Sequence, residues 1–529
     1  MAGEKRILRS WKELAAYLHR TARTCQRWER EFGLPIHRED EAPQASVYAY
    51  TDELDAWLSR KFHEPEIGEN QHSIAVLPFV DIDSRDSHER FCDGLAAALI
   101  DMLSQFQNLR VCALTSVLCL KGEKMDVREI GQRLRVGSIL EGCLQIRGKA
   151  IELSASLADA RDGFTVWAQR YAGHMDDLAP IEEDIVDNIV RILRLRSRYE
   201  GYPALKGSPP RNSEAFRLYI RGRYFWDKLG EKELNKSIVF FQEALKLDGG
   251  LAPAYAGLAD SYLRLASFGY LPPKEVLPKA KMATMKALML NGVLREALTV
   301  LAVVEWLFDY NPADAGKHFR RALDLYPNSA ETREWHGNFL ISMGQWDEGM
   351  AELEFALELD PLSLIINCSV AHGYYQGSDF ASAESQGRHC LGLAEDSAMA
   401  CHILGSVYLE KGMFEAARRE FQNAVNLSGR SPHCLARLAC TQALAGEAEG
   451  ARQILKQILN IFRQRYVDAT DIAEIYTALA DYEKAIRWLE RAFENRAINL
   501  IWIKCNPIFR RIQSDPRFRA LEKKMGLER

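Results

Sequence analysis

Small residues recur along the second half of the chain at a fixed interval of 34 positions. Small side chains at fixed offsets are what two stacked helices need when their backbones must approach closely, and a single helix pair cannot bury its apolar face alone. The three series are Gly337, Ala371, Gly405, Ala439 and Ala473; Ala315, Gly349, Ala383, Ala417, Ala451 and Ala485; and Ala322, Ala356, Cys390, Ala424 and Ala492, with a break at Ile458. The pattern predicts a stack of helix-turn-helix units.

A helix-turn-helix unit of 34 residues resembles the tetratricopeptide repeat (TPR) family. The resemblance covers residues 214–529 as a superhelix of about eight units, and the first units are irregular. The tail NPIFRRIQSDPRFRALEKKMG is expected to form capping helices, because the open end of a solenoid must be covered. Its apolar face would consist of Phe509, Ile512, Phe518 and Leu521. The resemblance implies a binding surface and not a catalytic one.

In TPR arrays the first helix of each unit lines the inner groove. Transferred to this register, the predicted partner-binding groove contains Asn338, His372, Tyr375, His402, Ser406 and His433. This surface is apolar to mildly polar and has few cations, so a helix or an extended peptide of a protein partner fits it better than an acidic terminus. The groove is therefore predicted to bind a protein or peptide.

Three neighbouring pairs of histidine and cysteine occur in the same repeats, namely His389-Cys390, Cys401-His402 and His433-Cys434. Consecutive residues on a helix point in different directions, so one member of each pair is expected to face the core. Their spacings match no zinc pattern. The sequence therefore predicts no metal site and no cofactor.

The first 62 residues form a different pattern. SWKE at residues 10–13 is a capping box at the start of a short helix, and a second short helix follows with Ala22, Cys25 and Trp28 facing inward. IHRED and SVYAY are expected to form two short strands, and TDELDAWLSRKF is expected to form a third helix. Two helices, a hairpin and a further helix predict a small winged helix-turn-helix.

The stretch SWKELAAYLHRTARTCQRWEREFGLPIHR, with SVYAY and ELDAWL after it, resembles the excisionase/MerR-like DNA-binding modules. The resemblance implies contact with double-stranded DNA through the second helix, its lead-in and the wing. The residues expected at DNA are Arg20, Arg23, Thr24, Gln26, Arg27, Arg30, Arg38 and Gln44. Two features depart from the family: His19 occupies the turn, and the wing carries the acids Glu39-Asp40-Glu41, which phosphate would repel. The alternative is that the arginines form a solvated helix face.

A polar linker at residues 63–72 leads to a segment at 73–198 whose pattern predicts the order βαβαβββα, an α/β sandwich with a mixed sheet. IAVLPF, FCDGLAAALIDMLS and ELSASLADARDGFTVWAQRY are among the stretches that resemble the TolB amino-terminal-type domain, which implies a non-catalytic sensing or interaction role. The segment contains no GxGxxG, P-loop or GxSxG motif. A second linker, rich in proline and glycine, follows at 199–213.

Composition sets the remaining limits. A chain of 529 residues needs several cores, and its net charge of −5 means that any DNA contact must come from a local patch. The charged amino terminus is unlike a signal peptide, and no apolar run reaches the roughly 18 residues of a membrane-spanning helix. The eleven cysteines form no CxxC pair, which is typical of reduced thiols in a cytoplasm.

The sequence as a whole predicts a mainly α multidomain protein: a cytoplasmic bacterial transcription regulator that binds DNA, holds a protein partner and forms a homodimer on a two-fold DNA site. One alternative is a TPR scaffold whose helix-turn-helix no longer binds DNA. A second is an enzyme with a cryptic site in the middle domain, but no nucleophile-base pair or metal constellation supports it. We therefore expect a protein that is not an enzyme.

Overall fold

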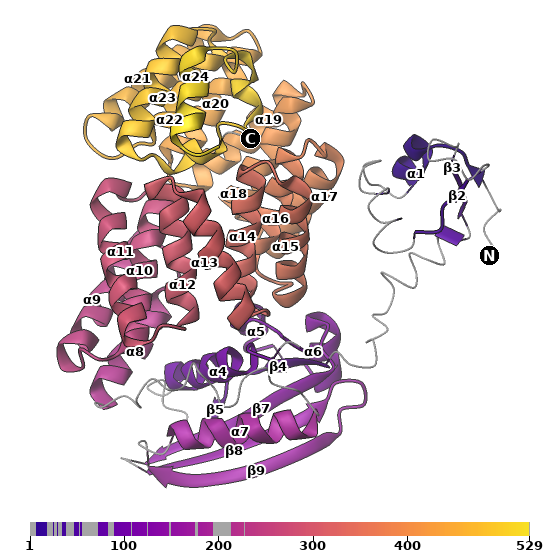
Figure 1. Ribbon diagram of the computed structural model, residues 1–529, viewed down its shortest axis with the longest axis vertical. Coiled ribbons are helices and arrows are strands. Elements are labelled where there is room, and N and C mark those ends of the chain that lie inside the picture. Colours follow the sequence, from indigo (N-terminus) through magenta and orange to yellow (C-terminus); the bar gives the residue numbers. More distant parts are fainter. Residues whose placement is uncertain are drawn as a thin grey trace.

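The computed structural model describes residues 7–17, 25, 29, 34–38, 47–51, 53–54, 72–82, 89–106, 108–123, 125–147, 150–174, 178–193, 213–226 and 228–527. The described part contains a small amino-terminal unit, a mixed α/β domain and a long array of paired helices (Figure 1). This architecture confirms the predicted fold class, a mainly helical TPR-like solenoid preceded by smaller sheet-containing parts.

The amino-terminal unit is built around a three-stranded antiparallel sheet in the order β1-β3-β2. Its elements are β1 (Ile7–Leu8), α1 (Trp11–Tyr17), β2 (His37–Arg38) and β3 (Val47–Tyr50). The hairpin strands β2 and β3 were predicted, but β1 was not, because two residues are too few to show an alternating pattern. The buried core residues are Leu8, Leu14, Cys25, Leu34, Val47, Ala49 and Leu54.

Helix α1 begins with the predicted serine and glutamate, and one of the two capping-box bonds is shifted by one residue. The backbone amide of Glu13 donates to Ser10 Oγ at 3.2 Å. The carboxylate of Glu13 accepts from the amide of Arg9 at 2.9 Å, and not from that of Ser10. The side chains still satisfy two free amides at the start of the helix, which is the physical purpose of the motif.

The α/β domain contains one mixed sheet of six strands, in which the order β6-β4-β7-β8-β9 forms the main path and β5 pairs with β7. The pairs of β4 with β6 and β7 are parallel, whereas β7, β8 and β9 form an antiparallel meander. The elements are β4 (His72–Val76), β5 (Val80–Asp81), α4 (Glu89–Leu103), β6 (Leu109–Val111), α5 (Leu114–Leu118), α6 (Val127–Leu134), β7 (Ser138–Arg147), β8 (Ala150–Asp159), β9 (Thr165–His174) and α7 (Leu178–Ile192).

Helices cover both faces of this sheet. One core lies between the sheet and helices α4 and α7, and Leu99 and Ile185 are fully buried there. A smaller core lies on the other face under α5 and α6, around Val117 and Leu134. Strand β6 has only three residues, because the chain turns into α5 at Leu114. Helix α5 was not predicted.

The array consists of eight successive helix pairs within residues 213–226 and 228–495. The pairs are α8 (Ser213–Trp226) with α9 (Glu231–Leu247), α10 (Ala252–Ser267) with α11 (Pro273–Leu290), α12 (Arg295–Val304) with α13 (Pro312–Leu325), α14 (Ala330–Ser342) with α15 (Trp346–Leu359), α16 (Leu364–Gln376) with α17 (Phe380–Leu393), α18 (Ala398–Glu410) with α19 (Phe414–Leu427), α20 (Pro432–Leu444) with α21 (Ala448–Phe462), and α22 (Ala469–Ala478) with α23 (Tyr482–Asn495). Between α12 and α13 the π-helix η3 (Glu305–Asp309) adds a wider turn.

The small residues of the 34-residue register lie where the two helices of a unit touch. Gly337 of α14 and Gly349 of α15 face each other so closely that a Cβ on Gly337 would lie 2.8 Å from the Gly349 carbonyl oxygen. In a later unit, a Cβ on Gly405 would lie 2.9 Å from the ring of the buried Phe421. The register therefore exists because larger side chains would push the paired helices apart.

The segment after α23 returns across the inside of the array. It forms two 3₁₀-helices, η4 (Ile498–Trp502) and η5 (Pro507–Arg511), and the helix α24 (Pro516–Lys524). The four apolar residues predicted for its inner face are all buried. Lys504 Nζ donates to the carbonyl oxygen of Met343 at 3.1 Å, and the indole of Trp502 meets the ring of Trp306 edge to face. The tail thus packs on the middle repeats as well as on the last one.

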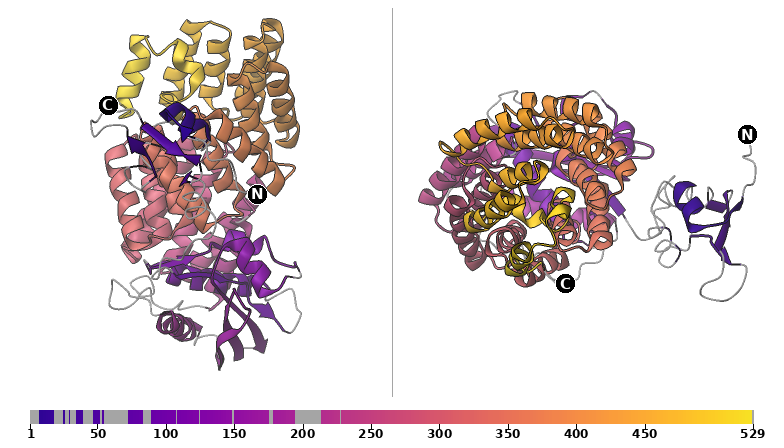
Figure 2. Two further views of the ribbon diagram at one scale, coloured as in Figure 1. Left: turned by 90° about the vertical axis from the view of Figure 1, so that its right-hand side faces the viewer. Right: turned by 90° about the horizontal axis from the view of Figure 1, so that it is seen from above.

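The array curls around a central axis, as the view from above shows (Figure 2). Its last unit lies against η3, where Phe493 of α23 stacks on Tyr310 at 5.3 Å between ring centroids. Units far apart in the sequence are therefore neighbours in space. Among the described residues, the structure has no helix that is both long enough and apolar enough to cross a membrane.

The α/β domain is docked on one end of the array (Figure 1). Ser116 of α5 donates from its hydroxyl and from its backbone amide to the same carboxylate oxygen of Asp360, at 2.5 and 3.0 Å. Asn328 of the array donates to the carbonyl oxygens of Phe106 at 2.8 Å and Leu109 at 2.7 Å. All these polar groups are buried and bonded, so the interface holds the two domains in one defined orientation.

Candidate functional sites

The amino-terminal unit contains one described residue of the predicted DNA-binding set, Arg38 in β2. The other seven predicted contacts lie outside the described residues, namely Arg20, Arg23, Thr24, Gln26, Arg27, Arg30 and Gln44. The predicted DNA-binding face therefore stays a prediction. The described residues include only part of the amino-terminal unit on which this face would lie.

Arg38 is already engaged by an acid of the same unit. Its guanidinium lies 2.5 Å from a carboxylate oxygen of Glu29, and this hydrogen bond raises the pKa of Arg38. The Arg38 side chain remains 38% exposed, so a phosphate can still approach it. Any DNA contact by Arg38 must compete with Glu29 or share the guanidinium with it.

The predicted groove residues of the array converge on one cavity of about 230 Å³. Five of the six predicted residues line it, on the first helices of three consecutive units: His372, Tyr375, His402, Ser406 and His433. The remaining wall contains Gln376, Ile403, Arg437, Glu474, Asn499, Trp502 and Asn506. We call this space the central cavity. Because three of its lining residues belong to the returning tail, this part of the concave surface already holds the chain's own carboxyl-terminal segment.

A buried ion pair forms the floor of the central cavity. Arg437 of α20 donates to Glu474 of α22 at 3.0 Å and to Ser406 at 3.3 Å, and both charged side chains are at most 6% exposed. Glu474 also accepts from the side-chain amide of Asn506 at 2.6 Å. Burial disfavours the charged form of Arg437, but the pair with Glu474 outweighs this and raises the pKa of Arg437. The groove was predicted to contain few cations, but Arg437 is one of the residues that line the central cavity.

The three histidines of the central cavity differ in charge. Burial lowers the pKa of His372 to about 4 and that of His402 well below its ordinary value, so both are neutral near pH 7. Burial also disfavours the charged form of His433, but its ion pair with Asp471 at 2.7 Å outweighs this and raises its pKa to about 9. The cavity therefore has two cations, Arg437 and His433, and each is bonded to its own carboxylate.

The sixth predicted groove residue, Asn338, lies in a separate polar network nearer the start of the array. Its side-chain amide donates to Glu334 at 2.7 Å, and Ser369 donates to the same carboxylate oxygen at 2.7 Å. Burial raises the pKa of Glu334 to about 7. Asn338 is 8% exposed, so its contacts are mainly internal.

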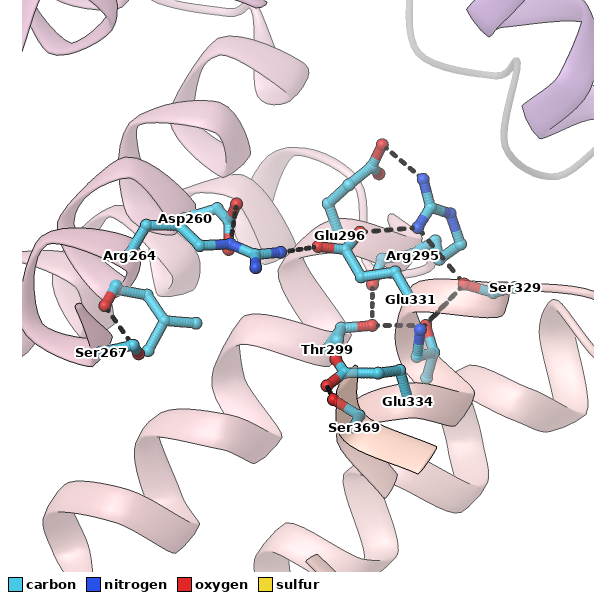
Figure 3. A network of polar contacts seen from close by, with 12 residues as sticks. Asp260, Arg264, Ser267, Arg295, Glu296, Thr299, Ser329, Glu331, Glu334 and Ser369 are labelled. Carbon is cyan, nitrogen blue, oxygen red and sulfur yellow. Dashed lines mark hydrogen bonds and ion pairs between the residues drawn. The ribbon is translucent and has the colours of Figure 1, made fainter. Parts of the chain in front are cut away.

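This network crosses the first helices of four units (Figure 3). Arg264 of α10 lies 2.5 Å from Glu331 of α14, and Arg295 of α12 contacts Glu331 at 3.4 Å and Glu296 at 3.0 Å. Arg295 also reaches Asp101 of helix α4 at 2.9 Å. Burial raises the pKa of Asp101 to about 6, although Arg295 opposes this shift. A continuous set of charges thus joins the array to the α/β domain.

The histidine-cysteine pairs are arranged as predicted, with their two side chains in different environments. His389 is exposed whereas Cys390 is buried, and Cys401 is buried behind His402. Within the residues that the structure describes, no group of three or more histidine, cysteine or acidic side chains is placed to hold a metal ion.

The cavity residues from the last unit and from the tail were not predicted, and neither were Gln376, Ile403 and Arg437 on the first helices of the earlier units. The signal for Glu474 was present, because it lies 34 positions after Cys440, in the same series as Asn338, His372 and Ser406. No periodic signal exists for Asn499, Trp502 and Asn506, which lie in or beside the short 3₁₀-helices η4 and η5 beyond the last repeat.

Comparison with protein families gives two matches. Residues 70–189 match the second domain of the HilA/YgeH-like transcriptional regulators. Residues 398–430 and 470–499 match the tetratricopeptide repeat. The chain therefore carries a HilA/YgeH-like regulator domain together with TPR units, whereas the excisionase/MerR-like and TolB-type resemblances remain predictions.

Among curated proteins, the chain is 28% identical over 190 residues to the putative adenylate cyclase 3 of Rhizobium meliloti (strain 1021), a match over 35% of this chain and 32% of that protein. It is 23% identical over 301 residues to the transcriptional regulator HilA of Salmonella typhimurium (strain LT2), over 55% of this chain and 51% of that protein. The matches thus span only a third to a half of these relatives.

Solved structures with similar helical arrays include the human IFIT1 dimer with m7Gppp-AAAA, with a TM-score of 0.43, 17% identity, and coverage of 65% of this chain and 77% of that chain. The yeast Tom70 structure matches with a TM-score of 0.37, 18% identity, and coverage of 60% of this chain and 68% of that chain. These likenesses concern the helical-repeat fold.

Proposed function

We propose that the chain is a bacterial transcription regulator that contacts DNA through its amino-terminal unit and a protein or peptide partner through its TPR array. The observation that carries the proposal is the match of residues 70–189 to the second domain of a transcription-regulator family, directly after the amino-terminal unit. The weaker similarity to the transcriptional regulator HilA over 301 residues points the same way.

The geometry of the amino-terminal unit supports a DNA-binding role. A short helix, α1, packs with a three-stranded sheet, and the β2-β3 hairpin corresponds to the predicted wing. Arg38 projects from this hairpin and is partly exposed. In winged helix-turn-helix proteins such a frame presents a helix to the major groove and a hairpin to the backbone, where arginines bind phosphates and guanine edges.

The TPR fold supports a protein or peptide partner, because stacked helix pairs present extended concave and convex surfaces. The part of the concave surface around the central cavity is occupied by the returning tail. We place the partner on the remaining surface of the array and assign the protein no enzymatic activity. The proposal includes a cytoplasmic location. It also includes a homodimer, since DNA sites with two-fold symmetry are bound by dimers.

The test is DNA binding by the full-length protein, measured by fluorescence anisotropy over a range of salt concentrations. DNA from the protein's own upstream region is compared with random DNA of the same length. We expect selective binding with a steep salt dependence, and Arg27→Ala should cost about 1–3 kcal/mol if this side chain contacts a base edge. Arg161→Ala is the matched control, because this exposed arginine lies in the α/β domain and pairs with Asp159.

A second variant uses the contact seen in the structure. Glu29→Gln removes the acid that holds Arg38, so we expect tighter binding and a salt slope steeper by about one phosphate contact. Unchanged or weaker binding by Glu29→Gln would remove Arg38 from the interface. Absence of binding by the wild type at low salt would favour the scaffold alternative, in which only the array has a partner.

A further inference from the structure

We propose that the central cavity binds a small, uncharged, planar heteroaromatic molecule with hydrogen-bond donors and acceptors on its edge, the class to which the free nucleobases belong. The site is distinct from the proposed DNA-binding unit, and the inference holds whether or not that unit binds DNA. It rests on the size of the cavity, its unpartnered polar atoms, its aromatic walls and its balanced charge.

The central cavity is lined by elements that are distant in the sequence. Helices α16, α18 and α20 supply one wall, α22 supplies Glu474, and the tail supplies Trp502 on the opposite side. Its volume of about 230 Å³ is below the range of roughly 300–1,000 Å³ that is typical of sites for drug-sized ligands. A small molecule fits this space, whereas a peptide would have to displace the tail.

Several polar atoms of the lining residues are buried without a hydrogen-bond partner in the part of the chain that the structure describes. These include Nδ1 of His402 and Oε1 of Gln376. The hydroxyl of Tyr375 lies beside Arg437. The side-chain NH2 group of Gln376 donates to Nε2 of His372 at 2.9 Å. The side-chain oxygen of Gln376 remains available as an acceptor. Buried polar atoms are normally bonded, because leaving them unpaired costs free energy. The set offers a ligand both a donor and an acceptor.

The walls of the central cavity are aromatic and flat. His402 stacks on His433 with 4.6 Å between ring centroids, and His372 meets Trp502 edge to face at 4.9 Å. Tyr375 lies beside His372 in a roughly parallel orientation. Such rings favour a planar ligand, because a planar ligand can stack on the face of one ring and contact the edge of another.

The charges of the central cavity balance one another, which favours an uncharged guest. Arg437 is paired with Glu474, and His433 is paired with Asp471, so the two cations and two anions balance. A guest that carries a charge would add an uncompensated charge to this balanced set. An uncharged guest makes hydrogen bonds without breaking either ion pair.

The experiment is isothermal titration calorimetry of the full-length protein with adenine, guanine, cytosine and uracil. Benzoate serves as a planar anionic comparison, and myo-inositol serves as an uncharged comparison that is not planar. We expect at least one base to bind with a stoichiometry of one and both comparison compounds to give no heat of binding. Failure of all four bases would overturn the proposal, and equal binding of benzoate or inositol would overturn the chemical class.

The location is tested with two matched tyrosine variants on the same helix. Tyr375→Phe removes only the cavity hydroxyl and should weaken binding at least about fivefold, the equivalent of one hydrogen bond. Tyr374→Phe is the control, since its hydroxyl bonds to Glu354 of α15 at 3.0 Å. Trp502→Leu should reduce affinity further by removing an aromatic wall. Binding by Tyr375→Phe and Trp502→Leu equal to wild type would place the ligand elsewhere and overturn the site.

A second measurement does not depend on the variants. Hydrogen exchange of η4 and η5 should slow when a base is added, because the ligand would contact Trp502 and hold the tail against the repeats. Exchange in the amino-terminal unit should stay the same. Binding without any slowing in the tail would contradict the assignment to the central cavity.

Discussion

The ion pair between Arg437 and Glu474 gives the sharpest prediction about stability. Arg437→Met keeps most of the volume of the side chain but leaves Glu474 buried without its cation. Removing one partner of a buried ion pair costs about 3–5 kcal/mol. Glu474 keeps its bond to Asn506 at 2.6 Å and remains near the protonated His433, so we expect the lower end, about 3 kcal/mol.

Hydrogen exchange followed by mass spectrometry is the suitable assay, because a chain with several domains has no single unfolding transition. A loss of about 3 kcal/mol should raise exchange rates in α20 and α22 by roughly a hundredfold. Helices α8 and α9 at the other end of the array should change little. Arg487→Met is the control, since this exposed arginine pairs with Glu483 on the surface, where such pairs contribute about 1 kcal/mol or less.

The double variant Arg437→Met with Glu474→Gln separates the lost charge balance from lost packing. Replacing both members of a buried pair by uncharged groups of similar size is often neutral. We therefore expect the double variant to regain most of the protection that the single variant loses. If the single variant exchanges less than about fivefold faster, or if the double variant is as unprotected as the single one, the pair does not stabilise this contact in the way argued.

Two further predictions concern the domain interface and the repeat register. Burial raises the pKa of Asp360 to about 6, above its unfolded value of about 4, so its contribution to stability is fully present below pH 4 and is lost as pH rises through 6. Asp360→Asn should flatten this dependence in the hydrogen-exchange protection of α5, corrected for the intrinsic effect of pH on exchange. Gly337→Ala should lower the local stability of α14 and α15 by about 1–3 kcal/mol in hydrogen exchange, because its Cβ would meet the Gly349 carbonyl oxygen at 2.8 Å. Gly392→Ala, at an open position, should be close to neutral, and equal effects at the two glycines would refute the packing argument.

Much of the candidate site could be predicted because it lies in a periodic part of the chain. The series that contains His372 and Ser406 identifies inner-face positions from spacing alone, and five of the six predicted residues line the central cavity. Asn338 belongs to the same series, but it bonds within another network, because Glu334 and Ser369 lie beside it. Periodicity gives the face of a helix, whereas the neighbours across that face depend on how the whole array curls.

The sequence by itself determined the local structure of the array. Helix pairing, the positions of small residues and the buried face of the tail all follow from interactions between residues close along the chain or one repeat apart. These short-range rules have a sequence signal because each unit repeats the same contacts. The mixed sheet was also predictable, because its long strands β7 and β8 have apolar residues on the face that is buried.

Only the tertiary structure decided which distant segments meet. Helix α5 has five residues and no periodic signal, yet Ser116 on it bonds to Asp360, more than two hundred positions away. The tail returns to place Trp502 against His372, and Arg437 meets a carboxylate of the next unit. Such contacts depend on the accumulated rotation between successive helix pairs, a small quantity per unit that no single stretch of sequence displays. That rotation converts an open groove into the central cavity.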